Sequence, residues 1–343
     1  MQSSTTDHNQ KLLDADGPDT VRLSVAEARQ LGEAGLKCVG YSGEDARIVV
    51  DHLVDNALCG YMFAGLPRVL AIVDDEKTHK ARKPVRIVSE TPLSALVDGG
   101  NNVGYIVAYR AAEIALDKVR TSGMASVGAY NSYYSGRNAY FVEKIVKEGF
   151  VVMHVASATP HVLPLGGKRP ALGTNPICFG FPSEQGPVIV DMGTAAVMWG
   201  DVVLHAQLGQ LLPEGVGFDA EGCPSRDAAA VLQGGVGTFG GYKGFGLSFA
   251  VQALGLLAGA ALTRGNVQDY GFLFWVINPA VMLPGGDFEK QMSELVRKIK
   301  ETPRQPGVDE IRIPSERANR ERERRLKEGI VIERKIFELL KAL

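Results

Sequence analysis

Alternation of strand and helix patterns between residues 85 and 156 is the feature that most limits what this chain can fold into. Two amphipathic helices are predicted there, at Gly104–Arg120 and Asn138–Glu148. Runs rich in apolar residues predict strands around them, at Val85–Ser89, Leu93–Asp98, Met124–Tyr130 and Phe150–Ala156. Such alternation is typical of an α/β domain, in which helices cover a sheet.

Helical patterns also mark both ends of the chain. Ser24 and Ser42 stand where they can cap two helices within Val21–Leu58, and Phe288–Lys300 is predicted as a further helix. Ser315 is expected to cap a last helix with the surface run RANRERERRLKEG. Glu alternates with Arg in this run, which favours a solvated face with ion pairs over a basic binding arm.

The length of the chain predicts two lobes. At 343 residues it is about twice the size of a typical domain. Helical patterns mark both ends of the chain, and the alternation of strands and helices lies between them.

Charge and cysteine content exclude several classes of function. The net charge is −2, and no basic face is interleaved with aromatic residues, so nucleic acid is not an expected partner. The 4 cysteines lack metal-ligand spacing, and we expect buried free thiols and no metal. The polar N-terminus lacks the apolar region of a secretory signal. Together these features predict a cytoplasmic protein.

One segment is long enough to cross a bilayer. Residues 244–262 carry no charge. The segment is isolated, rich in Gly and Ala, and lacks aromatic or basic flanks. We therefore expect a buried helix and no membrane partner.

A glycine loop precedes this apolar segment. Residues 235–240 (GVGTFG) match the dinucleotide pattern G-x-G-x-x-G, which needs a preceding strand and an acidic residue about twenty positions on. A predicted helix at Arg226–Gln233 precedes the loop, and Ala260 stands at the acidic position, so a Rossmann fold is rejected. The following turn, GGYKG, can hold an anion through backbone amides and Lys243. The alternative is a packing turn with Lys243 in solvent.

Five segments together resemble the type-2 malate/L-lactate dehydrogenase family, in the family's own order. They are LGGKRPALGTNPICFGFP (165–182), VDMGT (190–194), LPEGVGFDAEGCPSRD (212–227), GGYKGFGL (240–247) and IPSERANRERERRLKEGI (313–330). The family includes relatives of ureidoglycolate dehydrogenase, diketogulonate reductase and piperideine-2-carboxylate reductase. The resemblance implies a non-Rossmann mixed sheet that binds NADPH or NADH, and a second helical lobe built from both chain ends. This helical lobe would comprise residues 1–90, with residues 288–343 packing back on it, and the central sheet domain would comprise residues 91–287. It also implies a homodimer, and reduction of 2-oxo acids or cyclic imine carboxylates, or the reverse oxidation.

The resemblance assigns cofactor contacts to specific positions. At the end of a strand, Asp191 to Thr194 would contact the nicotinamide nucleotide, and Lys243 would reach its ribose or phosphate. Glu316 and Ser315 would also contact the nucleotide. The alternative for Asp191 is a capping role at the end of a strand. The alternative for Glu316 is an acid in the first turn of a helix, where acids are favoured. The full set implied by the resemblance is Ser157, Thr174, Asn175, Asp191, Met192, Gly193, Thr194, Tyr242, Lys243, Ser315 and Glu316.

Two family motifs depart from their usual residues. The family's S-H-G-x-x-R reads FAGLPR here (63–68), so the arginine of the motif is retained as Arg68. Arg68 would bind a substrate carboxylate, and the alternative is a surface arginine. The family's N-S-x-H-F-G reads NSYYSG (131–136), which puts Tyr134 in place of a histidine. Tyr134 would be the proton donor or a packed aromatic. His161 is a reserve candidate for the same task.

Loss of both histidines affects the predicted reaction. An imine is readily protonated, so its reduction needs an enzymic acid less than ketone reduction does. We predict an NAD(P)H-dependent reductase of a C=N or C=O group beside a carboxylate, acting on a small molecule. The alternatives are a 2-hydroxy-acid dehydrogenase that uses Tyr134 or His161, and a catalytically silent relative that binds a nucleotide. The substrate and the choice between NADH and NADPH stay open.

Overall fold

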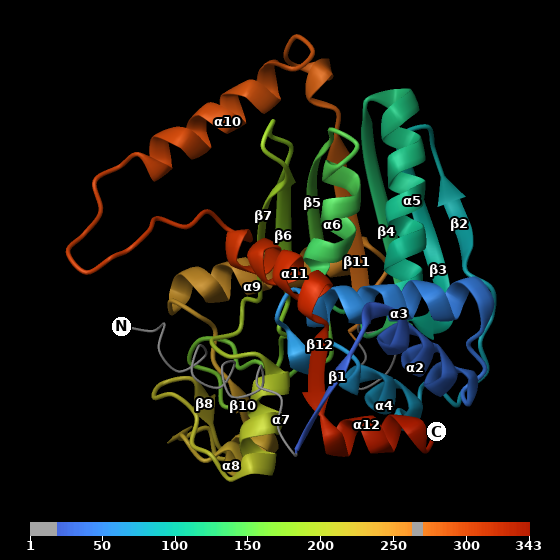
Figure 1. The fold of residues 1–343 in the computed structure, drawn as a ribbon, viewed down its shortest axis with the longest axis vertical. Helices are drawn as coiled ribbons and strands as arrows, with labels where there is room; N and C mark the ends of the chain where they lie inside the picture. Colours follow the sequence, from blue (N-terminus) through green and yellow to red (C-terminus); the bar gives the residue numbers. More distant parts are fainter. Residues whose placement is uncertain (1–18, 263–269) are drawn as a thin grey trace. The chain divides into compact units, whose positions relative to one another are not determined.

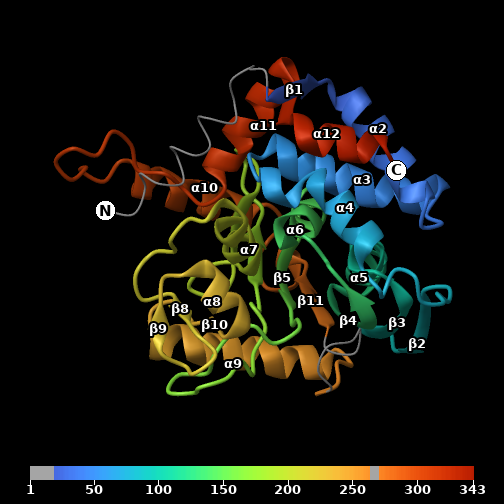
Figure 2. The same cartoon turned by 90° about the horizontal axis from the view of Figure 1, so that it is seen from below.

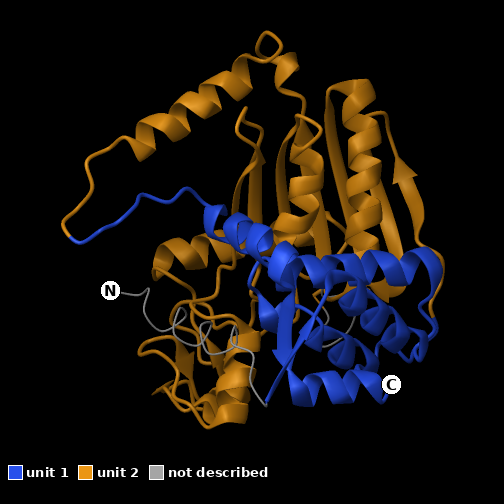
Figure 3. Ribbon diagram, in the orientation of Figure 1, with its two compact units in different colours: residues 1–81, 307–343 blue, residues 82–306 orange. Residues whose placement is uncertain are grey.

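A seven-stranded mixed sheet forms the centre of the larger of two units in the computed structural model, which describes residues 19–262 and 270–343. Unit 1 combines residues 1–81 and 307–343, and unit 2 comprises residues 82–306 (Figure 3). The second unit built from both chain ends agrees with the expected architecture. The domain boundaries expected at residues 90 and 288 stay predictions.

The sheet of unit 2 has the order β2-β3-β4-β11-β5-β6-β7. Only β3 and β4 pair in parallel, and the other neighbours are antiparallel. A Rossmann sheet is mostly parallel, so this topology confirms the predicted non-Rossmann fold. The strands are β2 (Arg86–Glu90), β3 (Ser94–Val103), β4 (Met124–Tyr133), β5 (Val151–Ala156), β6 (Ile177–Phe181), β7 (Val188–Met192) and β11 (Gly271–Ile277).

Helices cover both faces of this sheet (Figures 1 and 2). On one face lie α5 (Gly104–Ser122), which connects the two parallel strands, and α6 (Asn138–Val146). On the other lies α9 (Tyr242–Leu257), which packs against β5 and β11. A Cβ at Gly271 would lie 2.2 Å from the carbonyl oxygen of Gly255. The close approach of helix and strand therefore requires glycine at that point.

The buried helix expected at residues 244–262 corresponds to α9, which begins at Tyr242 and ends at Leu257. It is buried on one side only, since Phe249 and Leu257 are exposed. Within the described parts of the chain, no helix is both long and apolar enough to cross a membrane. The glycine pattern at residues 235–240 follows helix α8 (Ala228–Gln233) and starts with the two-residue strand β10 (Gly235–Val236). A strand does not precede it, which agrees with rejection of the Rossmann motif.

A smaller subdomain of unit 2 holds the three-stranded sheet β10-β8-β9, with α7 (Trp199–Leu208) and α8. Strands β8 (Gly217–Phe218) and β9 (Pro224–Ser225) lie inside the family-like segment of residues 212–227, for which the sequence predicted no strand. Two-residue strands have too few residues to show alternation. The subdomain has its own apolar core, formed by Val162, Leu172, Ala195, Val202, Leu212, Ala228, Val231 and Val236. Farther along unit 2 are η3 (Pro279–Val281) and α10 (Asp287–Lys300).

Unit 1 joins the two chain ends by an antiparallel pair, β1 (Thr20–Leu23) with β12 (Ile330–Glu333). Ser24 forms the predicted cap of α2, because its hydroxyl accepts from the Glu27 N–H and the Glu27 carboxylate accepts from the Ser24 N–H. Ser42 precedes α3 without a side-chain capping bond. The helices of unit 1 are α2 (Val25–Lys37), α3 (Gly43–Leu58), η1 (Met62–Ala64), α4 (Pro67–Asp74), α11 (Glu316–Glu328) and α12 (Arg334–Lys341).

The C-terminal helices differ from the prediction in two respects. Ser315 precedes α11 in the left-handed region (φ 71°) and makes no side-chain capping bond. Helix α11 is not the last one, because α12 follows it. The predicted solvated, ion-paired face of α11 is present, with Arg324 between Glu321 and Glu328. Arg325 is the exception, since it is 2% exposed and donates to the carbonyl oxygen of Ala57.

The cysteines only partly fit the expectation of buried free thiols. All four are free, but Cys38 and Cys223 are exposed, and only Cys59 and Cys178 are buried. Cys38 follows α2 directly and Cys223 lies in a turn beside β9, so neither side chain faces a core. Cys59 also follows a helix directly but is buried, so a position at a helix end does not by itself predict the burial of a thiol.

Candidate functional site

The carboxylate of Asp191 holds the start of helix α6. Its Oδ2 accepts a hydrogen bond from the Ala139 N–H at 2.8 Å, so a residue near the end of β7 caps a helix from a distant part of the chain. Burial raises the pKa of Asp191, while this hydrogen bond and the charge of Arg137 act in the opposite direction. The capping alternative for Asp191 is thus realised in the structure, and a contact to a cofactor stays a prediction.

Asp191 belongs to a row of side chains across four strands. Phe274, His154, Cys178 and Asp191 are successive cross-strand partners on β11, β5, β6 and β7. Cross-strand partners point to the same face of a sheet. Burial lowers the pKa of His154 to about 3 and raises the pKa of the Cys178 thiol, to which the nearby Asp191 charge also contributes. His154 is therefore a neutral core residue at pH 7, as its apolar strand predicted.

Tyr134 follows β4 in a strained backbone conformation. Its φ is +53°, a region that bulky residues rarely adopt. The backbone just before Tyr134 is anchored, since Asn131 donates to the carboxylate of Asp98 (2.7 Å) and Ser132 donates to the carbonyl of Asn102 (2.7 Å). The ring of Tyr134 lies edge-on to Tyr133, with centroids 5.5 Å apart. The anchored strand end holds Tyr134 in this conformation against its local preference.

Asp98 is the charged member of this anchor. Burial acts to raise its pKa, but hydrogen bonds from Asn131, from the Gly100 N–H and from Arg86 lower it overall. The carboxylate therefore stays ionised near neutral pH and accepts these bonds.

Thr174, Asn175 and Thr194 lie together near α9. The Thr194 N–H and hydroxyl both donate to the carbonyl oxygen of Thr174, at 2.9 and 3.0 Å. Asn175 is fully buried and donates to the Ser248 carbonyl and to Gln252 on α9. The Oδ1 atom of Asn175 is buried, and among residues 19–262 and 270–343 it has no hydrogen-bond partner. The predicted cofactor residues of this group therefore do come together, and they retain an unused acceptor.

The turn at residues 191–194 also connects to the start of α9. The Phe239 N–H donates to the carbonyl oxygen of Thr194, and Tyr242 and Lys243 follow as the exposed first residues of the helix. Met192 is partly exposed, and a Cβ at Gly193 would lie 2.7 Å from the Met198 sulfur. Met198 thus packs directly over the Gly193 backbone.

Ser157 and His161 lie elsewhere in unit 2. Ser157 is fully buried and exchanges hydrogen bonds with Gly271, while its side chain fills the space beside Gly255. His161 stacks on Trp199 with centroids 4.1 Å apart and an angle of 8° between the planes. Burial lowers the pKa of His161 to about 4, so the ring is neutral at pH 7 and holds no proton as an imidazolium. Nothing in the sequence near His161 signals the stacking on Trp199.

Three predicted residues belong to unit 1. Arg68 is the second residue of α4, and its guanidinium lies over the Phe63 ring, 4.6 Å from the centroid. Glu316 accepts a hydrogen bond from the Ile313 N–H at 3.1 Å. It thus acts as an acid in the first turn of α11, which was the alternative to a cofactor contact. Ser315 adopts the left-handed conformation just before it.

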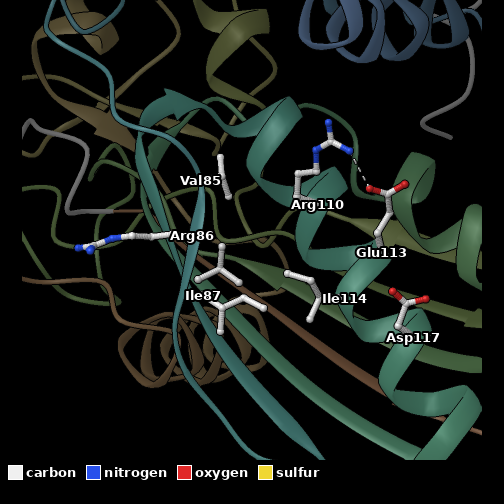
Figure 4. A pocket seen from close by; sticks show the side chains of 8 residues that line it. Val85, Arg86, Ile87, Arg110, Glu113, Ile114 and Asp117 are labelled. Carbon is white, nitrogen blue, oxygen red and sulfur yellow. Dashed lines mark hydrogen bonds and ion pairs between the residues drawn. The ribbon is translucent and has the colours of Figure 1, made fainter.

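A separate cavity of about 320 Å³ lies between α5 and the start of β2 (Figure 4). Arg110 and Glu113 form an ion pair at its rim, 3.1 Å apart. Its lining residues are Val85, Arg86, Ile87, Val97, Arg110, Glu113, Ile114 and Asp117. None of them is a predicted site residue, so this cavity is distinct from the candidate site.

Comparison with known proteins decides the family. A family model described as malate/L-lactate dehydrogenase matches residues 23–341. The chain belongs to this family. It is therefore an oxidoreductase, as the five resembling segments predicted, and dehydrogenases of this kind use a nicotinamide cofactor.

Several members of the malate/L-lactate dehydrogenase family are similar to the chain over most of its length. L-sulfolactate dehydrogenase of Methanothermobacter thermautotrophicus is 33% identical, covering 93% of this chain and 95% of that protein. A Delta(1)-pyrroline-2-carboxylate/Delta(1)-piperideine-2-carboxylate reductase of Pseudomonas putida is 35% identical, covering 72% and 74%. The structure of malate dehydrogenase from Pyrococcus horikoshii has a TM-score of 0.85 at 27% identity and covers 96% of both chains.

One polar residue near this site was not predicted. Asn138 begins α6 beside Asp191 and is 1% exposed. Neither its Oδ1 nor its Nδ2 has a hydrogen-bond partner within the described ranges. An asparagine at the start of a helix is common for capping reasons, so the sequence contains no signal that sets Asn138 apart.

Proposed function

We propose that this chain is an NAD(P)H-dependent reductase of a C=N or C=O group beside a carboxylate. In this proposal Tyr134 donates the proton, and Arg68 binds the carboxylate of the substrate. The cofactor supplies hydride when it is bound. The class of substrate covers cyclic imine carboxylates and 2-oxo acids.

The conformation of Tyr134 is the observation that carries the proposal. A bulky residue at φ +53° costs about 1 to 2 kcal/mol relative to an ordinary conformation. Such strain persists where the surroundings enforce it, and it concentrates at active sites. The bonds from Asn131 and Ser132 supply that enforcement. A tyrosine held this way, where the family has a histidine, supports a role in the reaction.

The chemistry of a phenol fits the reductive direction. A tyrosine with a reference pKa near 10 carries its proton at pH 7 and can donate it to a developing alkoxide or amine. It is a poor base for the oxidative direction. His161 is neutral at pH 7 because burial lowers its pKa to about 4, so we favour Tyr134 over His161 as the donor.

Arg68 fits the task of an anchor. A guanidinium can grip a carboxylate with two parallel hydrogen bonds. The Phe63 ring lies 4.6 Å below the Arg68 guanidinium and orients it through a cation–π contact. An arginine that is oriented before substrate arrives loses less side-chain freedom on binding.

The residues near the end of β7 fit a nicotinamide nucleotide. Polar atoms of Asn175 and Asn138 are buried there without partners in the described chain, and a polar ligand would satisfy them. Thr174 and Thr194 lie beside Asn175, and the first turn of α9 supplies Lys243 for a phosphate. Ser157, Asp191, Met192, Gly193, Tyr242, Ser315 and Glu316 complete the proposed set of cofactor residues.

A second candidate is a 2-hydroxy-acid dehydrogenase. The similarity to L-sulfolactate dehydrogenase over 93% of the chain favours it. The similarity to the Pseudomonas putida reductase favours imine reduction. A silent nucleotide-binding relative would bind cofactor without turnover of either substrate class.

A substrate panel tests these candidates. The purified protein is assayed with NADH and with NADPH against cyclic imine carboxylates and 2-oxo acids, and in reverse with the corresponding amino and hydroxy acids. We expect reduction to be faster than oxidation near pH 7. Tyr134→Phe should lower kcat by about 10²- to 10⁴-fold without weakening cofactor binding. Tyr130→Phe on β4, the strand that leads to Tyr134, is the matched control. Equal activity of wild type and Tyr134→Phe would refute the role of Tyr134.

We also propose a cytoplasmic homodimer. The outer side of α9 exposes Tyr242, Phe249 and Leu257 at 70%, 64% and 65%, and Lys243 is its sole charged residue. Exposed apolar surface of this kind is typical of an interface, and a second copy is the proposed occupant. Light scattering should give twice the mass of one chain. Phe249→Glu should give monomers, and a monomeric wild type would refute the proposal.

A further inference from the structure

Asn138 carries a buried amide that has no hydrogen-bond partner in the part of the chain that the structure describes. Its side chain is 1% exposed, and across residues 19–262 and 270–343 neither Nδ2 nor Oδ1 has a hydrogen-bond partner. A side-chain amide can donate two hydrogen bonds and accept two. Buried polar groups without partners are rare in proteins, because they have lost water without a replacement. A partner that is not part of the chain would account for this amide.

The position of Asn138 limits what that partner can be. Asn138 is the first residue of α6, and the next N–H, that of Ala139, is already bound by the Asp191 carboxylate. The carboxylate of Asp191 therefore already interacts with the positive N-terminal end of α6. A second anion, such as a substrate carboxylate, would meet the Asp191 charge and would leave the Asn138 acceptor unused. The unused amide therefore favours a neutral ligand.

A neutral ligand must offer both a donor and an acceptor to satisfy both ends of the amide. A carboxamide does so, because its N–H can bond to Oδ1 while its carbonyl accepts from Nδ2. A carbonyl or imine substrate lacks this pairing. The strained Tyr134, four residues earlier, and Asp191 both lie at this end of unit 2.

We propose that Asn138 recognises the carboxamide of the nicotinamide ring, next to the proton donor Tyr134. This inference rests on the nicotinamide cofactor of the proposed function, but not on the identity of the substrate. The loop that leads into α6 includes exposed Gly136 and half-buried Arg137. Solvent-exposed chain thus lies only two residues from the buried amide.

Calorimetric titration of the whole protein with two reduced dinucleotides tests the proposal. One is NADH, or NADPH if the wild type prefers it. The other is the 3-acetylpyridine analogue, in which a methyl group replaces the carboxamide NH₂. The wild type should bind the natural cofactor about tenfold more tightly than the analogue, as expected for one lost hydrogen bond to a buried acceptor. Asn138→Leu should bind the two about equally.

A stability measurement without ligand separates recognition from a structural role. Because leucine has a similar volume and no polar atoms, Asn138→Leu should raise Tm by about 1 to 3 °C. Asn56→Leu is the matched control, since Asn56 is equally buried on α3 but donates to the Ala64 carbonyl. It should lower Tm.

Three results would overturn the inference. The first is an unchanged preference for the natural cofactor in Asn138→Leu, and the second is a fall in Tm as large as that of Asn56→Leu. The third is a wild type that binds no dinucleotide, which would refute the proposed cofactor as well. If dinucleotides bind with the expected preference but no imine or oxo acid is reduced, the proposed substrate class fails and the role of Asn138 stands.

Discussion

The buried histidine of β5 should control much of the acid sensitivity of this protein. His154 is fully buried, and its ring stacks on Phe274 with centroids 3.8 Å apart. Its Nδ1 lies 3.0 Å from the carbonyl oxygen of Leu273. A carbonyl only accepts, so Nδ1 carries the proton of the neutral ring. In the described structure Nε2 has no partner, so protonation there would create a buried, unpaired charge.

The lowered pKa of His154 determines how the stability of the folded protein changes with pH. Burial lowers the pKa of His154 from 6.5 to about 3, while the bond to Leu273 acts in the opposite direction. Below the unfolded-state pKa the unfolded chain binds a proton that the folded protein refuses. Stability is therefore lost as the pH falls from about 6.5 toward about 3. Near pH 4.5, two pH units at about 1.4 kcal/mol each correspond to about 3 kcal/mol.

Urea unfolding at pH 7 and near pH 4.5 measures this loss for the wild type and two variants. His154→Phe keeps an aromatic ring next to Phe274, and His154→Gln keeps a donor for the Leu273 carbonyl. Both should lose about 3 kcal/mol less than the wild type between the two pH values, whatever their stability at pH 7. Other titrating groups are common to all three proteins and cancel in the comparison.

His79→Gln is the matched control, because His79 is exposed. This variant should lose as much stability between the two pH values as the wild type does. The reasoning is refuted if the wild type and His154→Phe lose stability in parallel. It is also refuted if His79→Gln reproduces the effect of the His154 variants.

Four further predictions concern packing, charge and capping. Gly180→Ala should lower the free energy of unfolding by about 1 to 3 kcal/mol, since its Cβ would lie 2.4 Å from a Val142 methyl; Val142→Ala in the same chain should restore part of this loss in urea unfolding. Arg325→Ala should cost about 2 kcal/mol by the same measurement, because it removes a buried donor to a carbonyl and a carboxylate. Ser24→Ala should cost about 1 kcal/mol through the lost capping box, visible as a lower Tm. Asp191→Asn should be more stable than the wild type at pH 7 and equal to it near pH 3, because burial raises the pKa of Asp191 and the ionised form is the one penalised as the pH rises; a gap that does not change with pH would contradict this.

Much of the fold could be predicted because helix and strand periods are local properties of the sequence. The predicted helix Gly104–Arg120 corresponds to α5, and the predicted strand Phe150–Ala156 corresponds to β5. The predictions were weakest for features that depend on tertiary contacts and not on the helix or strand period of the sequence. The pairs β8–β9 and β8–β10 have only two residues per strand, and the thiols of Cys38 and Cys223 are exposed.

The candidate site was predicted less completely than the fold. Resemblance to a family picks out residues at motif positions, such as Asp191 and Tyr134. It does not show what each side chain contacts. Asp191 caps α6, and Ser157 packs against Gly255, which no motif indicates. Asn138 lies outside the motifs, and its proposed role follows from the lack of a partner for its amide among residues 19–262 and 270–343.

The sequence alone therefore determined the family, the α/β class, the rejection of a Rossmann fold and the replacement of two histidines. Each of these depends on residue identity and spacing along the chain. Only the tertiary structure decided that Tyr134 is held at positive φ, that His154 and His161 are neutral, and that the amide of Asn138 has no partner among the described residues. The physical reason is that strain, desolvation and hydrogen-bond satisfaction depend on neighbours brought from far along the chain, which one-dimensional patterns do not contain.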